Sequence, residues 1–171
     1  MKYFAVLFSL LFFLSIGAQN TSYYPQPIGF VSDFEKDFSP DDVKALNLMV
    51  KQLLVKTMER DSLKGIEIAL VTVTDSMFGN TKEMSDYAQA LADKWGVGSK
   101  PYHRGIVIAY GQKIRKVAIV AGTGLDKILP PVACKDIVNQ KMSAEFKKGD
   151  PYQALVAAVD GIAQYLGISL K

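Results

Sequence analysis

Several residue types are scarce in this sequence, and each scarcity narrows what the protein can be. The 171 residues include one cysteine, Cys134, and one histidine, His103. A single cysteine excludes an intramolecular disulfide, so packing alone must hold the fold together. Because Cys134 follows the apolar Val132 and Ala133 and lies far from the N-terminus, we expect a small buried core residue and no lipid attachment.

An excess of charge is also missing. The chain carries 20 lysines and arginines against 17 aspartates and glutamates, a net charge of +3. The tight basic groups are limited to Lys113, Arg115 and Lys116 and to the pair Lys147 and Lys148. A protein that binds a polyanion needs a larger and more clustered basic surface, so we expect no nucleic-acid partner.

Long hydrophobic runs are confined to the N-terminus. Lys2 precedes an apolar run from Phe4 to Ile16, and the small residues Gly17 and Ala18 follow. This order is typical of a secretory signal peptide. The run is shorter than the ~20 residues that a spanning helix needs. We therefore expect residues 1–18 to be cleaved near Ala18, with no permanent membrane anchor and a soluble periplasmic or secreted product.

The remaining sequence predicts one α/β domain. Residues 19–28 contain two prolines and no helical period, so they predict an extended lead-in before a domain over residues 29–171. Ser39, Pro40 and two aspartates form a helix start, and apolar spacing carries that helix to about Glu59. An apolar β-branched run from Ile66 to Val73 predicts a central strand.

The later segments predict the remaining strands and the helices that pack on the sheet. Residues 80–83 have capping-box spacing before a crossover helix that ends at Trp95. Residues 105–110 and 117–121 predict an antiparallel hairpin because their joint is short and polar. Pro130 and Pro131 open a helix in which Val132 should share a buried side, and Asp150 caps the last helix. We expect helices on both faces of the sheet.

The hairpin suggests a place for chemistry. Antiparallel pairing would bring His103 and Arg104, before the first strand, beside Gly122, Thr123 and Gly124, after the second. Glycine N–H groups and the Arg104 guanidinium could bind a phosphate or another anion, although two glycines after a strand commonly just make a turn. His103 is the only imidazole available as a general base, or else a solvated loop residue.

Loop carboxylates offer a second kind of site. Asp33 precedes the first helix, and Asp75 ends the central strand. Asp126 follows residues 122–124, which we call the glycine loop. Acids in such loops can bind a hard cation such as calcium through their oxygen atoms. The sequence contains neither EF-hand nor zinc-site spacing.

A series of short motifs, taken in order, resembles the TPM domain family. The motifs are Pro27-Ile28-Gly29-Phe30-Val31-Ser32-Asp33-Phe34, the strand 66–74, Tyr87-Ala88, Trp95-Gly96-Val97-Gly98, Gly105-Ile106-Val107-Ile108-Ala109, Gly122-Thr123-Gly124-Leu125 and Phe146-Lys147-Lys148-Gly149-Asp150. The resemblance covers almost all of residues 19–171. It implies a three-layer α/β/α sandwich with a small mixed sheet that ends in a β-hairpin.

The resemblance also implies function. Some members bind calcium or another divalent ion and have acid-phosphatase-like activity, and Asp33 matches a characteristic acid of the family. The usual Asp-Asn pair before the hairpin is replaced here by His103 and Arg104, which should weaken a calcium site and favour an anion or a softer metal. In the segment after the glycine loop, family members often have an aspartate directly after a proline. This chain has Pro130 followed by Pro131 there, so a second acid is missing from the expected site. Many bacterial members carry a C-terminal membrane segment with a glycine-rich tail, and without them we expect this chain to act as a free domain.

Two functional hypotheses follow from the sequence, beside a third interpretation in which the chain keeps the fold and has no functional site. The first is a weak, divalent-metal-dependent phosphomonoesterase, with Asp33 and His103 as metal ligands and with Arg104, Gly122, Thr123 and Gly124 holding the phosphate. The second is a non-catalytic module that binds an ion or an envelope protein and assists the maintenance or assembly of envelope proteins.

Overall fold

The computed structural model describes residues 22–98 and 101–170, so the expected signal peptide and its cleavage point lie outside the described residues. Within those described ranges, no helix has both the length and the apolar character needed to cross a membrane. The extended lead-in is described from Ser22 onward, and it contains no helix or strand up to Ile28.

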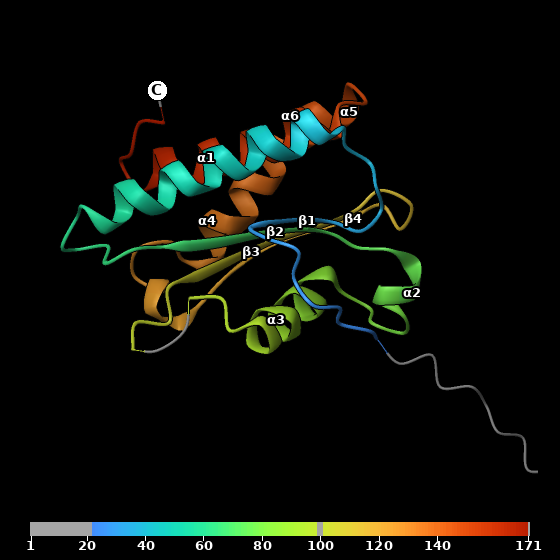
Figure 1. Cartoon of the computed structure of the whole chain (residues 1–171), viewed down its shortest axis with the longest axis horizontal. Helices are drawn as coiled ribbons and strands as arrows, with labels where there is room; N and C mark the ends of the chain where they lie inside the picture. The colour runs from blue at the N-terminus through green and yellow to red at the C-terminus, as the bar shows by residue number, and fades with distance from the viewer. Residues whose placement is uncertain (1–21, 99–100, 171) are drawn as a thin grey trace, which may run out of the picture.

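A four-stranded mixed sheet lies in the middle of the molecule (Figure 1). Its strands are β1 (Val31–Asp33), β2 (Glu67–Thr72), β3 (Gly105–Gly111) and β4 (Lys116–Ala121). Their order in the sheet is β1-β2-β3-β4. The first three strands run parallel, and β3 and β4 form the expected antiparallel hairpin.

Helices cover both faces of this sheet, which confirms the predicted α/β/α sandwich (Figure 1). One face carries α1 (Pro40–Met58), α4 (Pro131–Asp136), the π-helical turn η2 (Ile137–Met142), α5 (Ser143–Lys147) and α6 (Pro151–Tyr165). The other face carries α2 (Asp75–Phe78) and α3 (Met84–Trp95). A short 3-10 turn, η1 (Thr123–Leu125), follows β4.

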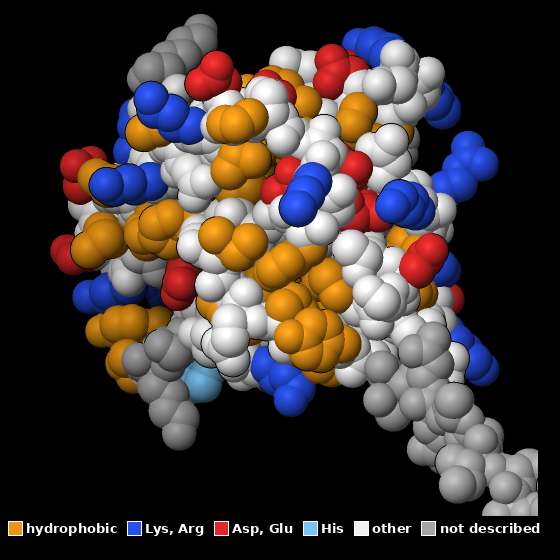
Figure 2. Space-filling view, turned by 45° about the vertical axis from the view of Figure 1, so that its right-hand side comes forward, with side chains coloured by type: hydrophobic (Ala, Val, Ile, Leu, Met, Phe, Trp, Pro, Cys, Tyr) orange, Lys and Arg blue, Asp and Glu red, His pale blue; other side chains and the backbone are white. Residues whose placement is uncertain are grey.

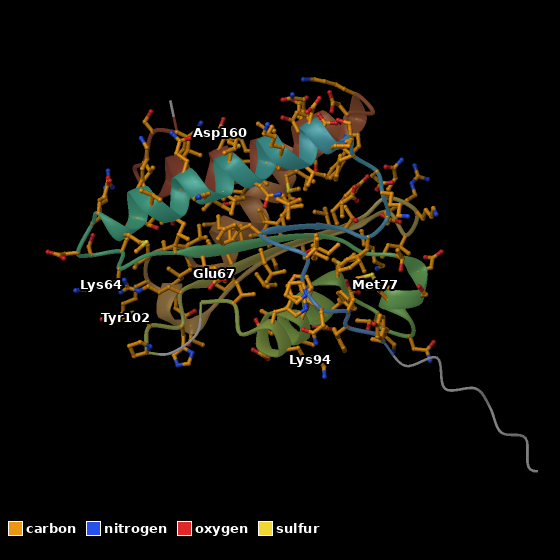
Figure 3. The ribbon with its side chains drawn as sticks, viewed as in Figure 1. Lys64, Glu67, Met77, Lys94, Tyr102 and Asp160 are labelled. Carbon is orange, nitrogen blue, oxygen red and sulfur yellow. The ribbon has the colours of Figure 1, made fainter. Side chains whose placement is uncertain are left out.

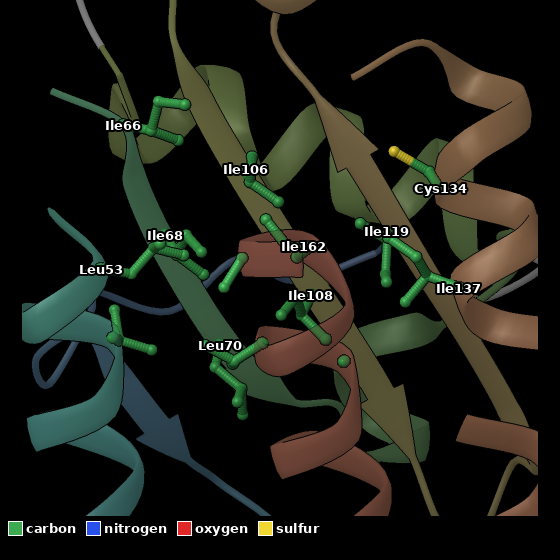
Figure 4. Packing of buried hydrophobic residues seen from close by; sticks show 14 of the residues in the cluster. Leu53, Ile66, Ile68, Leu70, Ile106, Ile108, Ile119, Cys134, Ile137 and Ile162 are labelled. Atoms are coloured by element: carbon green, nitrogen blue, oxygen red, sulfur yellow. The ribbon is translucent and has the colours of Figure 1, made fainter. Parts of the chain in front are cut away.

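The alternation of side chains along β2 explains the two layers. Ile68 and Leu70 point to the core shared with α1 and α6, as Figure 4 shows around Leu53 and Ile162. Ala69 and Val71 belong to the core under α3. A strand that is apolar on both faces needs cover on both, which is the pattern that the sequence predicted.

The lead-in is fixed to α3 by specific contacts. The Trp95 Nε1–H donates to the Pro25 carbonyl at 2.7 Å, and the Tyr87 hydroxyl donates to the Tyr23 carbonyl at 2.8 Å. The ring of Tyr24 stacks on that of Tyr87 with centroids 5.0 Å apart. Residues 22–28 are therefore a packed part of the domain although they form no regular element.

Helix ends test the cap predictions one by one. Ser39 is the expected N-cap of α1, and with Asp42 it forms a capping box that the sequence analysis did not predict. Asp150 caps α6 as expected and accepts from the Gln153 N–H at 2.9 Å. The capping box at residues 80–83 is wrong, because α3 begins after Glu83 with no side-chain cap. The prediction that Val132 is buried is also wrong.

Helix α4 explains that second error. It turns Ala133 and Cys134 inward and leaves Val132 63% exposed. Cys134 is buried as expected, and burial raises the pKa of its thiol to about 11. Such a thiol stays protonated at neutral pH and is a core residue.

A candidate acidic loop at one end of the sheet

The carboxyl ends of β1, β2 and β3 lie at the same end of the sheet. Asp33 is the last residue of β1, and the register places it level with Thr72 of β2 and Tyr110 of β3. The chain then turns through residues 33–38, which we call the acidic loop because it contains Asp33, Glu35 and Asp37. In open α/β sheets, binding sites lie outside this end of parallel strands.

Asp33 holds the acidic loop in shape. Its Oδ1 accepts from the Thr72 hydroxyl at 2.8 Å and from the Asp37 N–H at 3.2 Å, and its Oδ2 accepts from the Phe38 N–H at 3.1 Å. The same Thr72 hydroxyl oxygen accepts from the Glu35 N–H at 2.8 Å. Both Asp33 oxygens therefore already have donors, and the residue braces the loop.

Glu35 and Asp37 are less well satisfied. Glu35 Oε2 accepts from the Gln112 N–H at 2.7 Å, but Glu35 Oε1 and Asp37 Oδ2 are buried without a hydrogen-bond donor. Burial first, then the charges of Glu35 and Asp33 and a carboxyl–carboxyl hydrogen bond with Glu35, raise the pKa of Asp37 to about 6. The charge of Lys113 lowers it in part. Two neighbouring carboxyl groups in this position favour a shared proton or a bound cation.

A hollow of about 310 Å³ lies at the same end of the sheet. Tyr110, Gln112, Arg115, Lys116 and Phe146 are among the residues that line it. The Tyr110 ring stacks on Phe146 with centroids 5.0 Å apart. Burial, with the nearby charges of Asp37 and Glu35, raises the pKa of Tyr110 to about 12. On the face that Figure 2 brings forward, acidic and basic side chains gather side by side.

The donor set of the acidic loop suits a hard cation only in part. Carboxylate oxygens are the donors that calcium and magnesium prefer, and Glu35 Oε1 and Asp37 Oδ2 are two such oxygens without a partner. The residues that the structure describes contain no group of three or more His, Cys, Asp or Glu side chains close enough to hold a metal together. Main-chain carbonyls and water would have to complete the coordination.

His103 and Arg104 lie at the opposite end of the sheet from Asp33. They precede Gly105, which is level with Glu67 at the start of β2, whereas Asp33 is level with Thr72 at its end. Five residue steps along a strand span roughly 16 Å. Figure 3 shows the separation, with Tyr102 near Lys64 at one end and Met77 near the other. A single metal site that contains both Asp33 and His103 is therefore not formed, which corrects that expectation.

The hairpin does bring His103 and Arg104 to the glycine loop, as predicted. The Gly122 N–H donates to the Gly105 carbonyl at 2.8 Å, and the Gly124 N–H donates to the His103 carbonyl at 3.1 Å. A Cβ at Gly124 would overlap the Tyr102 carbonyl oxygen. These glycines are engaged in close backbone packing, so their N–H groups do not point freely toward an anion.

The other members of the predicted anion site are arranged as follows. Thr123 is exposed on η1. The Arg104 guanidinium donates to the Ser62 carbonyl at 3.1 Å and lies over the Tyr102 ring, 5.5 Å from its centroid. An anion role at this end remains a prediction that depends on Arg104 and Thr123.

The two residues that matter most at the acidic loop were absent from the predicted ligand set. Glu35 and Asp37 follow Asp33 at alternate positions, a spacing visible in the sequence as Asp-Phe-Glu-Lys-Asp. Three acids so close together in one loop could have pointed to the cluster. Of the other acids considered as ligands, Asp75 opens α2 behind the Thr74 cap and Asp126 is exposed after η1.

Comparisons with known proteins agree with this architecture. A family model described as the TPM domain matches residues 31–165. Among solved structures, the chain is similar to the N-terminal domain of a protein from P. gingivalis, with a TM-score of 0.65 and 24% identity, over 80% of this chain and 81% of that one.

Two further solved structures share the fold. The BA42 protein from the psychrophilic bacterium Bizionia argentinensis matches with a TM-score of 0.58 and 16% identity, over 78% of this chain and 84% of that one. The N-terminal domain of the cg2496 protein from Corynebacterium glutamicum matches with a TM-score of 0.57 and 13% identity, over 89% and 90%. Among curated proteins, none matches the chain significantly.

Proposed function

Because the chain belongs to the TPM domain family, we propose that it is a divalent-cation-binding domain whose acidic loop takes calcium. The observation that carries this proposal is the pair of buried carboxylate oxygens, Glu35 Oε1 and Asp37 Oδ2, that lack any donor. Buried polar atoms without a partner are costly, so the folded loop gains free energy from whatever satisfies them.

Two partners can satisfy these oxygens, and pH selects between them. Below about pH 6 a proton on Asp37 allows the carboxyl–carboxyl hydrogen bond with Glu35. Above that pH the ionised Asp37 is repelled by the charge of Glu35, and a cation relieves the repulsion. Asp33 would act by fixing the loop, and the Gln112 N–H by holding Glu35 Oε2 at 2.7 Å. Calcium fits better than zinc because the donors are all oxygens.

A second candidate function, phosphomonoester hydrolysis, is favoured by the basic residues beside the acidic loop. Lys113 is close enough to affect the pKa of Asp37, and Arg115 and Lys116 line the adjoining hollow. A guanidinium and ammonium groups there could bind and orient a phosphate group. A divalent ion bound at the loop would supply Lewis acidity for the same phosphate. This moves the proposed phosphate site from the glycine loop to the hairpin turn.

The place of action is proposed from the sequence alone. The signal-peptide pattern in residues 1–18 supports export to the periplasm or the exterior. Calcium is more abundant in extracellular fluids than in cytoplasm, so weak binding by two free carboxylate oxygens would be useful there.

A thermal-shift series tests the cation proposal. Calcium should raise the Tm of the purified protein at pH 7.5, because a ligand that binds only the folded state stabilises it in proportion to RT ln(1 + [L]/Kd). Glu35→Gln and Asp37→Asn should each abolish the shift, whereas the matched control Asp126→Asn should keep it. Equal shifts in all four proteins would reject the acidic loop as the site.

The phosphatase candidate has its own readout. Release of phosphate from a generic aryl phosphate should require added divalent ion and should fall in Arg115→Gln. Activity that is unchanged without the ion would contradict it, and this result would leave the calcium shift to be judged separately.

A further inference from the structure

Strand β4 is an open edge of the sheet. The strand order ends at β4, so β3 occupies only one of its two sides. Its six residues are much less covered than those of β3: all seven residues of β3 are buried, whereas only Ile119 is buried in β4. The sheet's other edge, β1, is only three residues long. Proteins commonly shorten or charge their edge strands to prevent further pairing, and residues 117–121 of β4 contain neither charge nor proline.

The outward hydrogen-bonding groups of β4 can be assigned from the ladder. The Gly122 N–H bonds to the Gly105 carbonyl, and Gly105 and Gly122 continue the register in which Ile106 pairs with Ala121. In an antiparallel ladder the residues that bond to the neighbour alternate. Val117, Ile119 and Ala121 therefore direct their N–H and C=O groups away from β3, and no other described segment forms a main-chain hydrogen bond to them.

A groove of about 680 Å³ runs along this open edge. Its walls come from α3 on one face, through Met84 and Gln89, and from α4 and η2 on the other, through Cys134 and Val138. Figure 4 shows the second wall from inside, with Ile119 of β4 facing Cys134 and Ile137. An added strand would place alternate side chains against these two walls.

The charges of the groove specify the polarity of its occupant. Among the described residues that line it, Arg115, Lys116 and Lys135 stand against a single acid, Glu83. Arg115 and Lys116 lie where β4 begins, so the basic character is strongest at that end. We propose that β4 binds an extended acidic segment of another protein by strand addition, with the acidic end of the segment beside Arg115 and Lys116.

A second copy of this chain fits the groove less well. Its own β4 would bring the uncharged residues 117–121 and the basic Arg115 and Lys116 into a groove that already has an excess of basic side chains. Like charges across an interface disfavour pairing. An acidic peptide instead supplies the charge that the groove lacks.

Two synthetic peptides test the proposal directly. Each has six alternating valine and threonine residues, and one ends in Asp-Glu whereas the other ends in Lys-Lys. Fluorescence anisotropy should show saturable binding of the acidic peptide and at least tenfold weaker binding of the basic one. Lys135→Glu should weaken the acidic peptide roughly fivefold, as expected for reversal of one exposed charge, whereas the control Lys141→Glu on η2 should not. Equal affinity for both peptides would overturn the proposal.

Amide hydrogen exchange reports on the edge itself. The amides of Val117, Ile119 and Ala121 should exchange fast in the free protein and become protected when the acidic peptide is added, while those of Ala118 and Val120 are slow throughout. Protection elsewhere with no change at these three amides would contradict strand addition. Protection that grows with protein concentration in the absence of peptide would show that a second copy occupies the edge, and would also overturn the proposal.

Discussion

The Thr72 hydroxyl donates to the Asp33 carboxylate at 2.8 Å, and this bond joins the ends of β1 and β2. The same hydroxyl oxygen receives the Glu35 N–H, so one buried side chain fixes both the start and the middle of the acidic loop. The geometry of Glu35 and Asp37 therefore depends on a threonine that contributes no charge of its own. Strand β2, through Thr72, therefore holds the candidate cation site in place.

Thr72→Val should test how far that support extends. The substitution keeps the shape but removes one donor and one acceptor from a fully buried position, which should lower the free energy of unfolding by about 2 kcal/mol. It should also weaken the calcium-induced thermal shift, because the loop loses its anchor. Denaturant unfolding measures the first effect. The exposed Thr123→Val serves as control, and equal stability of the two variants would contradict the role given to Thr72.

The pH dependence of stability should depend on Asp37. Its pKa is about 6 in the folded protein, above the ordinary 3.8, so folding favours the protonated group. This contribution is fully present below about pH 4 and is lost as the pH rises to about 6. Asp37→Asn keeps a neutral side chain at every pH. The variant should therefore match the wild type near pH 4 and exceed it above pH 6.

The size of that difference is limited because the Asp37 side chain is partly solvated. About 1 kcal/mol at pH 7.5 is expected, measured by urea unfolding in a calcium-free buffer. Saturating calcium should remove or reverse the difference, since only the wild type has both carboxylates. A difference that stays constant between pH 4 and pH 8 would show that Asp37 does not titrate as described.

The glycine loop should behave as a packing device. Gly124→Ala would force a Cβ against the Tyr102 carbonyl oxygen, and the backbone shift should cost about 1–3 kcal/mol of unfolding free energy. Gly29→Ala is the matched control, because a Cβ there has no neighbour closer than 3.8 Å. Thermal unfolding of both variants makes the comparison, and similar Tm values would contradict the close packing.

The lead-in should loosen when its hydroxyl contact is removed. Tyr87→Phe keeps the fully buried ring but deletes the donor to the Tyr23 carbonyl, with an expected loss of about 1 kcal/mol. Limited proteolysis near residues 22–28 should become faster, whereas the exposed Tyr165→Phe should leave the rate unchanged. Unchanged cleavage in both would show that the contact does not hold the lead-in.

Local sequence patterns predicted most of the fold because each depends only on residues close together in the chain. The cap at Ser39, the apolar run of β2 and the short joint of the hairpin each specify an element without reference to the rest of the chain. Strand β1 was missed because it has only three residues and is stabilised by parallel pairing to β2, a partner almost forty residues away. A sequence pattern of that length does not distinguish a strand from an extended lead-in.

The candidate site was predicted less well for a related reason. The hairpin correctly placed His103 beside Gly122 and Gly124, since antiparallel neighbours have a defined register. The position of Asp33 depends on the direction of β1 relative to β3, which local patterns do not give. Because β1 is parallel to β3, Asp33 lies at the end where β3 finishes, beside Glu35 and Asp37 and away from His103.

Chemical-shift mapping of a calcium titration shows whether the acidic loop binds the cation. If the acidic loop is the cation site, amide signals of Glu35, Asp37, Phe38 and Gln112 should shift together and saturate at pH 7.5, and the shifts should disappear in Asp37→Asn. Signals of His103, Arg104 and Gly124 at the other end of the sheet should stay in place. Saturable shifts confined to that opposite end, or none at the acidic loop at millimolar calcium, would show that the acidic loop is not a calcium site.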